Sequence, residues 1–313
     1  MSSTHADAEN RYLLIAAAGA AVIGCVGVSF SFLASSEAIL LDGMFNLVYF
    51  VAALVTMKVA RLVHMGDSQD FPFGYAAFEP LVNGIKGVLM LGVMMMALVG
   101  AVEAILTGGH SIDPGPAVVY GAVAAAACWA LAIVAGKAAK KTGSPLIHAD
   151  ALNWQVNGAI STAVLAAFIG VMAIEGTSLQ FVAPYVDSSL VILVVIVSIS
   201  VPIRMAWQAL MELLARAPSN EIIEQVRKTI EDATDELPIQ EIFLRIIQPG
   251  RTRMVLVYVV LPEDFEVGRL ATLDALRAKT QDLLRALHPD TIVDMIFTAD
   301  PKIGALSTQP VKA

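Results

Sequence analysis

The sequence has few charged residues for its length: 15% of its 313 residues are Asp, Glu, Lys or Arg, whereas 57% are hydrophobic. Soluble domains are about a quarter charged and about half apolar. The shortage of charge therefore excludes an ordinary soluble protein and predicts an integral membrane protein. The formal net charge is -8, and many of the charges follow residue 216, so no nucleic acid is expected as a partner.

Cysteine is scarce too, and both copies, Cys25 and Cys128, lie inside apolar segments. This excludes a disulfide framework and a paired-cysteine metal motif. The first ten residues lack a basic region ahead of a short apolar core, so we expect no cleavable signal peptide. No segment offers a nucleophile with a paired base, so an enzyme is not expected. No cofactor is predicted either, apart from a divalent cation as a possible substrate.

Long apolar runs, by contrast, are plentiful. Six segments reach about 20 apolar residues, the length that crosses a bilayer as a helix. They cover residues 12–34, 37–64, 80–106, 115–137, 146–174 and 188–212. Basic residues flank two of the loops and follow the sixth segment: Lys58, Arg61, Lys137, Lys140, Lys141, Arg204 and Arg216. The other three loops have none, so the positive-inside rule predicts both termini in the cytoplasm, with the protein in the inner or plasma membrane.

The composition changes at Pro218. Amphipathic helices are predicted over residues 220–236 and 270–287, and β-rich runs over 239–247, 254–261 and 291–298. The turn signal at residues 248–251 predicts that the first two runs pair as a hairpin. This αββαβ order predicts a small α+β domain with both helices on one face of its sheet.

The predicted fold class is thus an α-helical membrane protein, with six transmembrane helices followed by this small domain. The predicted organisation is a cytoplasmic N-terminal segment (1–11), a transmembrane domain (12–216), a cytoplasmic αββαβ domain (217–300) and a disordered tail (301–313).

Polar residues interrupt the second apolar segment, where Asp42, Phe45, Asn46 and Tyr49 share one face of a helix with 3.6 residues per turn. An ionised Asp within a membrane costs about 2.5 to 3.5 kcal/mol on insertion scales. Asp42 should therefore face a partner, a cavity or a transported ion.

The fifth segment carries a matching stripe of Asp150, Asn153 and Asn157. The amides alone are explained by interhelical hydrogen bonding, worth about 0.6 to 2 kcal/mol per contact. Two stripes that each carry a carboxylate favour a polar pathway instead, so Asp42, Asn46 and these three residues are the candidates to line it.

Three further charges have structural explanations. Glu79 lies at the start of the third segment, Lys86 lies within it, and Arg204 lies near the end of the sixth. Lys86 either reaches the cytoplasmic face with its ammonium group or pairs with an acid, and structural pairing is the preferred interpretation.

Three motifs in this order resemble the cation diffusion facilitator family. Residues 35–43 (SSEAILLDG) are similar to the opening of the family's second span, 71–81 (FPFGYAAFEPL) to the stretch before its third, and 149–151 (ADA) to the start of its fifth. The resemblance covers nearly the whole chain. It implies a proton-coupled exporter of a divalent metal cation that works by alternating access as a homodimer.

The chain departs from the residues that this resemblance implies for the metal site. The register places the four usual ligand positions at Phe45, Tyr49, Asn153 and Asn157. Zinc prefers thiolate, imidazole or carboxylate ligands, so a conventional tetrahedral site is not expected, and Asp42 and Asp150 remain as candidate ligands. Two hypotheses therefore stand. One is a cation transporter with a rewritten oxygen-rich site, whose substrate is a magnesium- or manganese-like ion, a monovalent cation or protons alone. The other is a non-transporting membrane scaffold or regulator that retains the fold and the dimer interface.

Two regions that bind metal in some relatives also differ. Phe71 and Tyr75 stand where those relatives have histidines before the third span. The strands predicted after Pro218 contain no His or Cys, and His288 falls at a helix end, where a surface position is the default expectation. Regulatory metal sites are therefore not expected.

Overall fold

The computed structural model describes residues 3–63, 67–142, 145–266 and 268–305. The chain forms two compact units. The first consists of Met1–Lys58 and Val82–Trp207, and the second of Val59–Leu81 and Gln208–Ala313. Each unit is considered by itself below.

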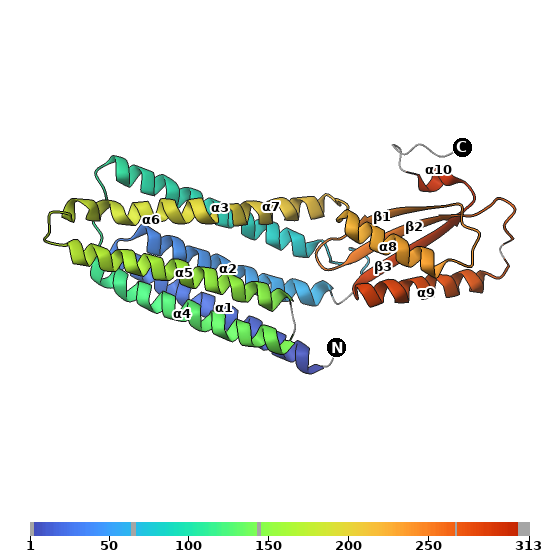
Figure 1. Ribbon diagram of the computed structural model, residues 1–313, viewed down its shortest axis with the longest axis horizontal. Coiled ribbons are helices and arrows are strands. Elements are labelled where there is room, and N and C mark those ends of the chain that lie inside the picture. Colours follow the sequence, from blue (N-terminus) through green and yellow to red (C-terminus); the bar gives the residue numbers. More distant parts are fainter. Residues whose placement is uncertain (1–2, 64–66, 143–144, 267, 306–313) are drawn as a thin grey trace. The chain divides into compact units, whose positions relative to one another are not determined.

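Six stretches of the described residues are long and apolar enough to span a membrane, which confirms the predicted number. The first five are α1 (Ser3–Ala34), α2 (Glu37–Val63), α3 (Phe78–Leu106), α4 (Pro114–Thr142) and α5 (Pro145–Ile174), as labelled in Figure 1. The sixth combines a 3-10 turn η1 (Gln180–Val182) with α6 (Ala183–Ser198) and α7 (Ser200–Leu213). Helix α1 begins within the predicted N-terminal segment, although its apolar span starts at Tyr12.

The sixth span differs from its prediction in two respects. It begins at Gln180 rather than residue 188, because the turn η1 leads directly into α6. Pro184 is tolerated in the first turn of α6, where a missing N–H costs nothing. The span is also interrupted at Ile199, between α6 and α7. Pro202 has no N–H to donate to the carbonyl oxygen of Ser198, so this peptide oxygen loses its usual helical partner.

Small residues allow close helix packing in the first unit. Helix α4 contacts both α1 and α5 and presents buried alanines, among them Ala117, Ala124 and Ala135. Helices α1 and α2 approach closely at Gly27 and Gly43, where a Cβ atom added to Gly27 would lie 2.8 Å from the Cα of Gly43. Such approach between backbones is typical of membrane helices, which gain van der Waals contact from small residues.

The C-terminal domain belongs to the second unit and has the predicted αββαβ order. It consists of α8 (Asn220–Ala233), β1 (Glu241–Ile247), β2 (Arg253–Val260), α9 (Leu270–Leu287) and β3 (Thr291–Thr298). The sheet order is β1-β2-β3, with β1 antiparallel and β3 parallel to β2. Helices α8 and α9 contact each other and bury Val255, Val257 and Val259 beneath them, so both cover one face (Figure 1).

The predicted disordered tail begins with structure. Residues Pro301–Gly304 form the short helix α10, and Gly304 packs against Phe243 and Tyr258 on the other face of the sheet. The predicted tail beyond residue 305 lies outside the described residues.

An ion pair in the second unit gives Glu79 a charged partner, Arg251. Arg251 lies in the turn between β1 and β2. Its guanidinium Nε donates to Glu79 Oε1 at 2.5 Å, and its backbone N–H donates to Glu79 Oε2 at 2.9 Å. The N–H of Gly250 donates to Glu212 Oε2 at 3.2 Å. Two carboxylates therefore hold this hairpin turn, which agrees with a structural role for Glu79.

Candidate functional site

The first candidate site lies around Asp42 on α2. The hydroxyl group of Tyr120 on α4 donates a hydrogen bond to Asp42 Oδ2. The amide of the buried Asn46, one turn along α2, lies 2.9 Å from the Asp42 carbonyl oxygen and 3.5 Å from its Oδ1. The carboxylate is therefore oriented by neutral groups from two helices.

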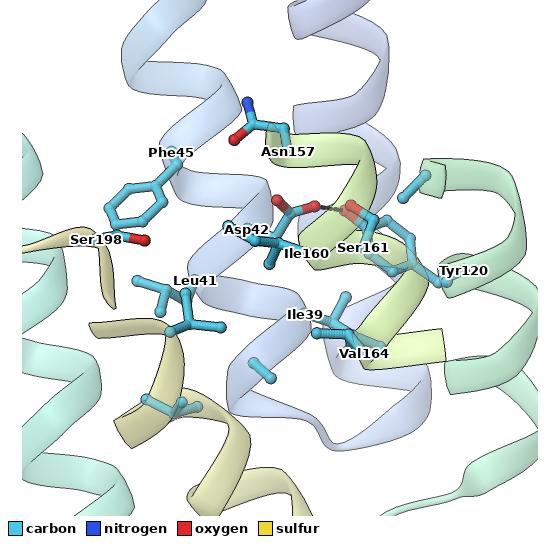
Figure 2. Close-up of a pocket in the computed structure, with 15 residues that line it drawn as sticks. Ile39, Leu41, Asp42, Phe45, Tyr120, Asn157, Ile160, Ser161, Val164 and Ser198 are labelled. Carbon is cyan, nitrogen blue, oxygen red and sulfur yellow. Dashed lines mark hydrogen bonds between the residues drawn. The ribbon is translucent and has the colours of Figure 1, made fainter. Parts of the chain in front are cut away.

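A cavity of about 70 Å³ opens beside this carboxylate, between helices α2, α4, α5 and α6. Figure 2 shows the Asp42 carboxylate facing Tyr120, with Phe45 and Ser198 on another side of the same cavity. The polar residues of its lining are Asp42, Tyr120, Asn157, Ser161 and Ser198. A single water requires only about 10 to 15 Å³ by this kind of measure, so the cavity can hold an ion with a few waters.

The α1–α2 crossing positions this site. A Cβ atom on Gly27 would lie 2.8 Å from both the Gly43 Cα and the Tyr120 hydroxyl oxygen. Gly43 directly follows Asp42 in the chain. The absence of side chains at the crossing therefore lets α2 approach α1 and brings Asp42 within reach of Tyr120.

The second candidate site lies around Asp150 on α5, which is 9% exposed. Tyr49 on α2 donates from its hydroxyl group to Asp150 Oδ1 at 2.7 Å, and the Tyr12 hydroxyl group on α1 donates to Oδ2. Lys86 on α3 places its Nζ 4.1 Å from the centre of the Tyr49 ring and interacts electrostatically with Asp150. Four helices thus meet at one carboxylate.

The predicted polar stripes are divided between these two sites. Asp42, Asn46, Phe45 and Asn157 belong to the Asp42 site, and Asp150 and Tyr49 to the other. Asn153 is exposed and lies outside the lining of the cavity, and Arg204 is also exposed. The structure therefore places the four usual ligand positions in different surroundings.

Three polar residues were missed by the sequence interpretation. Tyr12 and Tyr120 are the tyrosines of the first and fourth spans, and a phenol inside an apolar run is the signal that could have found them. The third, Asp187, is completely buried and accepts bonds from the Ser36 hydroxyl group at 2.5 Å and the Glu37 N–H at 2.8 Å. It caps the start of α2, and it was missed because the predicted sixth span began one residue too late to include it.

Conventional metal ligands do not gather elsewhere in the described part of the chain. Among the described residues, no group of three or more His, Cys, Asp and Glu side chains is placed to hold a metal ion. The rings of Phe71, Tyr75 and Phe78 pack against one another in tilted and edge-on contacts at the start of α3, with the first two ring centres 4.8 Å apart. The segment where some relatives have histidines is therefore an aromatic cluster here.

His288, expected at the surface, is partly buried at the end of α9. This burial, and next the nearby positive charge of Arg253, lower the pKa of the His288 imidazole. A lowered pKa favours the neutral ring, and within the described part of the chain the ring belongs to no group of three or more metal-ligating side chains.

Comparisons with known proteins agree with these features. The family model of the cation efflux transmembrane domain matches residues 13–214, which include all six spans almost completely. The chain is also similar to the manganese efflux system protein MneP of Bacillus subtilis (strain 168), with 27% identity over 272 residues, 85% of this chain and 89% of that protein. The chain is a multi-pass membrane protein and belongs to the cation efflux family, the cation diffusion facilitators.

Proposed function

We propose that this cation efflux transporter exports a divalent cation of the manganese or magnesium class in exchange for protons, with Asp42 as the ligand that carries charge. The observation behind this proposal is a single carboxylate beside a cavity whose other polar groups are hydroxyl groups and one amide. Oxygen ligands of this kind suit Mg²⁺ and Mn²⁺ better than Zn²⁺. The manganese named in the similar Bacillus protein supports the same class.

The backbone of the sixth span supplies a further oxygen. Ser198 lines the cavity, and Pro202 leaves its carbonyl oxygen without the usual helical N–H partner. In transporters, carbonyl groups freed by interrupted helices serve as cation ligands. The proposed site therefore combines Asp42 with side-chain oxygens of Asn157 and Ser161, this carbonyl group and retained water.

Protons supply the counter-flow in this proposal. The carboxylate of Asp42 binds either the cation or a proton, and alternating access exposes it to each side of the membrane in turn. We place both termini on the cytoplasmic side of an inner or plasma membrane, and the distribution of Lys and Arg among the loops supports this orientation. The resemblance to the cation diffusion facilitators is our reason to expect a homodimer.

Transport into vesicles tests this function. Purified protein in proteoliposomes is assayed for Mn²⁺, Mg²⁺, Zn²⁺ and K⁺ flux, with a pH-sensitive dye inside. We expect Mn²⁺ or Mg²⁺ flux with opposite proton movement in the native protein, and a loss of both by about 100-fold in Asp42→Asn. Glu103→Gln is the matched control, because this carboxylate lies at the end of α3 outside the cavity lining. Flux that is absent, or that survives Asp42→Asn, would refute the proposal, and absence would favour the scaffold hypothesis.

A further inference from the structure

The two carboxylates lie at two different levels of the pair of helices α2 and α5. On α2, Asp42 and Tyr49 are seven residues apart, and on α5, Asp150 and Asn157 are also seven apart. Seven residues make almost two full turns, so both members of each pair share a face about 10 Å apart along the axis. Asp42 and Asn157 meet at the cavity, whereas Tyr49 and Asp150 meet at the second site. Each level thus combines one carboxylate with one neutral partner.

The ligand atoms at the Asp150 level are suitable for a cation. Two carboxylate oxygens and the phenol oxygens of Tyr12 and Tyr49 converge there, from three helices. The Asp150 level thus offers a cation oxygen ligands that carry one negative charge in total, as the Asp42 level does. The Asp150 level nevertheless lies apart from the cavity, because none of Tyr12, Tyr49, Lys86 and Asp150 belongs to its lining.

The difference between the levels is Lys86. Its ammonium group lies 4.1 Å from the centre of the Tyr49 ring, in cation–π geometry, and also interacts with the Asp150 charge. An ammonium ion is a compact, fixed positive charge on a flexible stem. Its positive charge acts on Asp150 from beside the ring of Tyr49, whose hydroxyl group binds the same carboxylate.

We propose that Lys86 is a tethered cation that keeps metal ions out of the Asp150 site, so that each chain carries a single substrate cation, at Asp42. Loss of the ammonium group leaves a buried carboxylate with two phenol donors and no compensating charge. A divalent cation with oxygen preference then binds at this second site. The inference rests on the proposed function in one respect, the position of the native cation at Asp42. The expected behaviour of the Asp150 site does not depend on that function.

The experiment counts bound ions rather than transported ones. Mn²⁺ is titrated calorimetrically into the purified full-length chain in lipid nanodiscs. We expect one Mn²⁺ per chain in the native protein, two in Lys86→Gln, and one again in the double variant Lys86→Gln/Asp150→Asn. Lys86→Arg retains the positive charge and should bind one. The control Lys58→Gln, which removes an exposed lysine from α2, should also bind one.

The outcomes separate this inference from the proposed function. An unchanged count in Lys86→Gln would overturn the tethered cation even if the native protein binds Mn²⁺ at Asp42. Conversely, the inference is supported if Lys86→Gln binds an Mn²⁺ that is lost again in Lys86→Gln/Asp150→Asn, even if the native protein binds no Mn²⁺. If Lys86→Gln fails to fold, the single variant Asp150→Asn, which retains Lys86, tests the inference instead. Its count should equal the native one, and a lower count would place Asp150 in the native binding site and refute the inference.

Discussion

Asp42 and Asp150 are two carboxylates in one helical bundle, and their surroundings are opposite. Asp42 accepts a hydrogen bond from one tyrosine and borders a cavity, whereas Asp150 accepts from two tyrosines and has Lys86 nearby. A buried charge is costly unless its surroundings compensate it. Asp150 has two phenol donors and feels the charge of Lys86, whereas Asp42 has one phenol donor beside a cavity. The comparison indicates which acid is available to a cation and which one stabilises the bundle.

The largest expected effect separates the two acids directly. Asp42→Asn should reduce Mn²⁺ transport about 100-fold. The variant removes the charge that pairs with the bound cation, and the loss of one charge from a buried pair costs about 3 kcal/mol, where each 1.4 kcal/mol is tenfold. Asp150→Asn should leave the ion affinity near native. It should instead lower the free energy of unfolding by about 1 to 3 kcal/mol, because two phenol donors lose their charged acceptor. Vesicle flux and thermal unfolding of both variants check this, and equal losses of transport would erase the distinction.

A second acid in the cavity should sharpen the contrast. Phe45 lines the cavity beside Asp42, at one of the usual ligand positions. Phe45→Asp adds a second charge, and because ligand charge tunes cation affinity, Mn²⁺ should bind about tenfold more tightly. Calorimetry measures this change. Val164→Asp serves as the comparison, since it adds the same charge elsewhere in the lining, and equal gains in both would mean that charge alone, rather than position, determines affinity.

The contrast between these acids was only partly predictable from the sequence. Runs of about 20 apolar residues gave the six spans, and the 3.6-residue period correctly placed Asp42 and Asn46 on one side of α2. The hydrogen-bond donors were not predictable. Tyr12 and Tyr120 lie 138 and 78 residues away in sequence from the acids they contact, so tertiary packing alone brings them there.

The beginning of the sixth span shows a different limit. A hydropathy pattern places a helix end to within a few residues, and here that margin decided whether Asp187 belonged to a span. The C-terminal domain was easier, because alternating residues such as Val255, Val257 and Val259 specify which side of a strand is buried. Periodicity thus fixes faces, whereas partners across a bundle require the structure.

The crossing of α1 and α2 beside Asp42 offers an intermediate effect. A Cβ atom on Gly43 would lie 2.7 Å from the Val28 nitrogen and 2.9 Å from the Gly27 carbonyl carbon. Gly43→Ala should therefore cost about 1 to 3 kcal/mol of stability and weaken Mn²⁺ binding as α2 shifts. Gly92→Ala is the matched control, because its Cβ atom would meet open space and alanine favours the helix by about 1 kcal/mol. Equal melting temperatures for the two variants would contradict the tight crossing.

The smallest expected effect compares single hydroxyl groups. Tyr120→Phe removes the phenol donor of Asp42, and Tyr12→Phe removes one of the two donors of Asp150. Each should cost about 0.6 to 2 kcal/mol of stability, the usual range for hydrogen bonds within membranes. Tyr120→Phe should in addition change the KM for Mn²⁺ a few-fold, because this hydroxyl group lines the cavity, whereas Tyr12→Phe should leave the KM unchanged. Initial rates over a Mn²⁺ series distinguish the variants. A changed KM in Tyr12→Phe would show that the two acids act as one site, because a hydroxyl group outside the cavity would then control the bound ion.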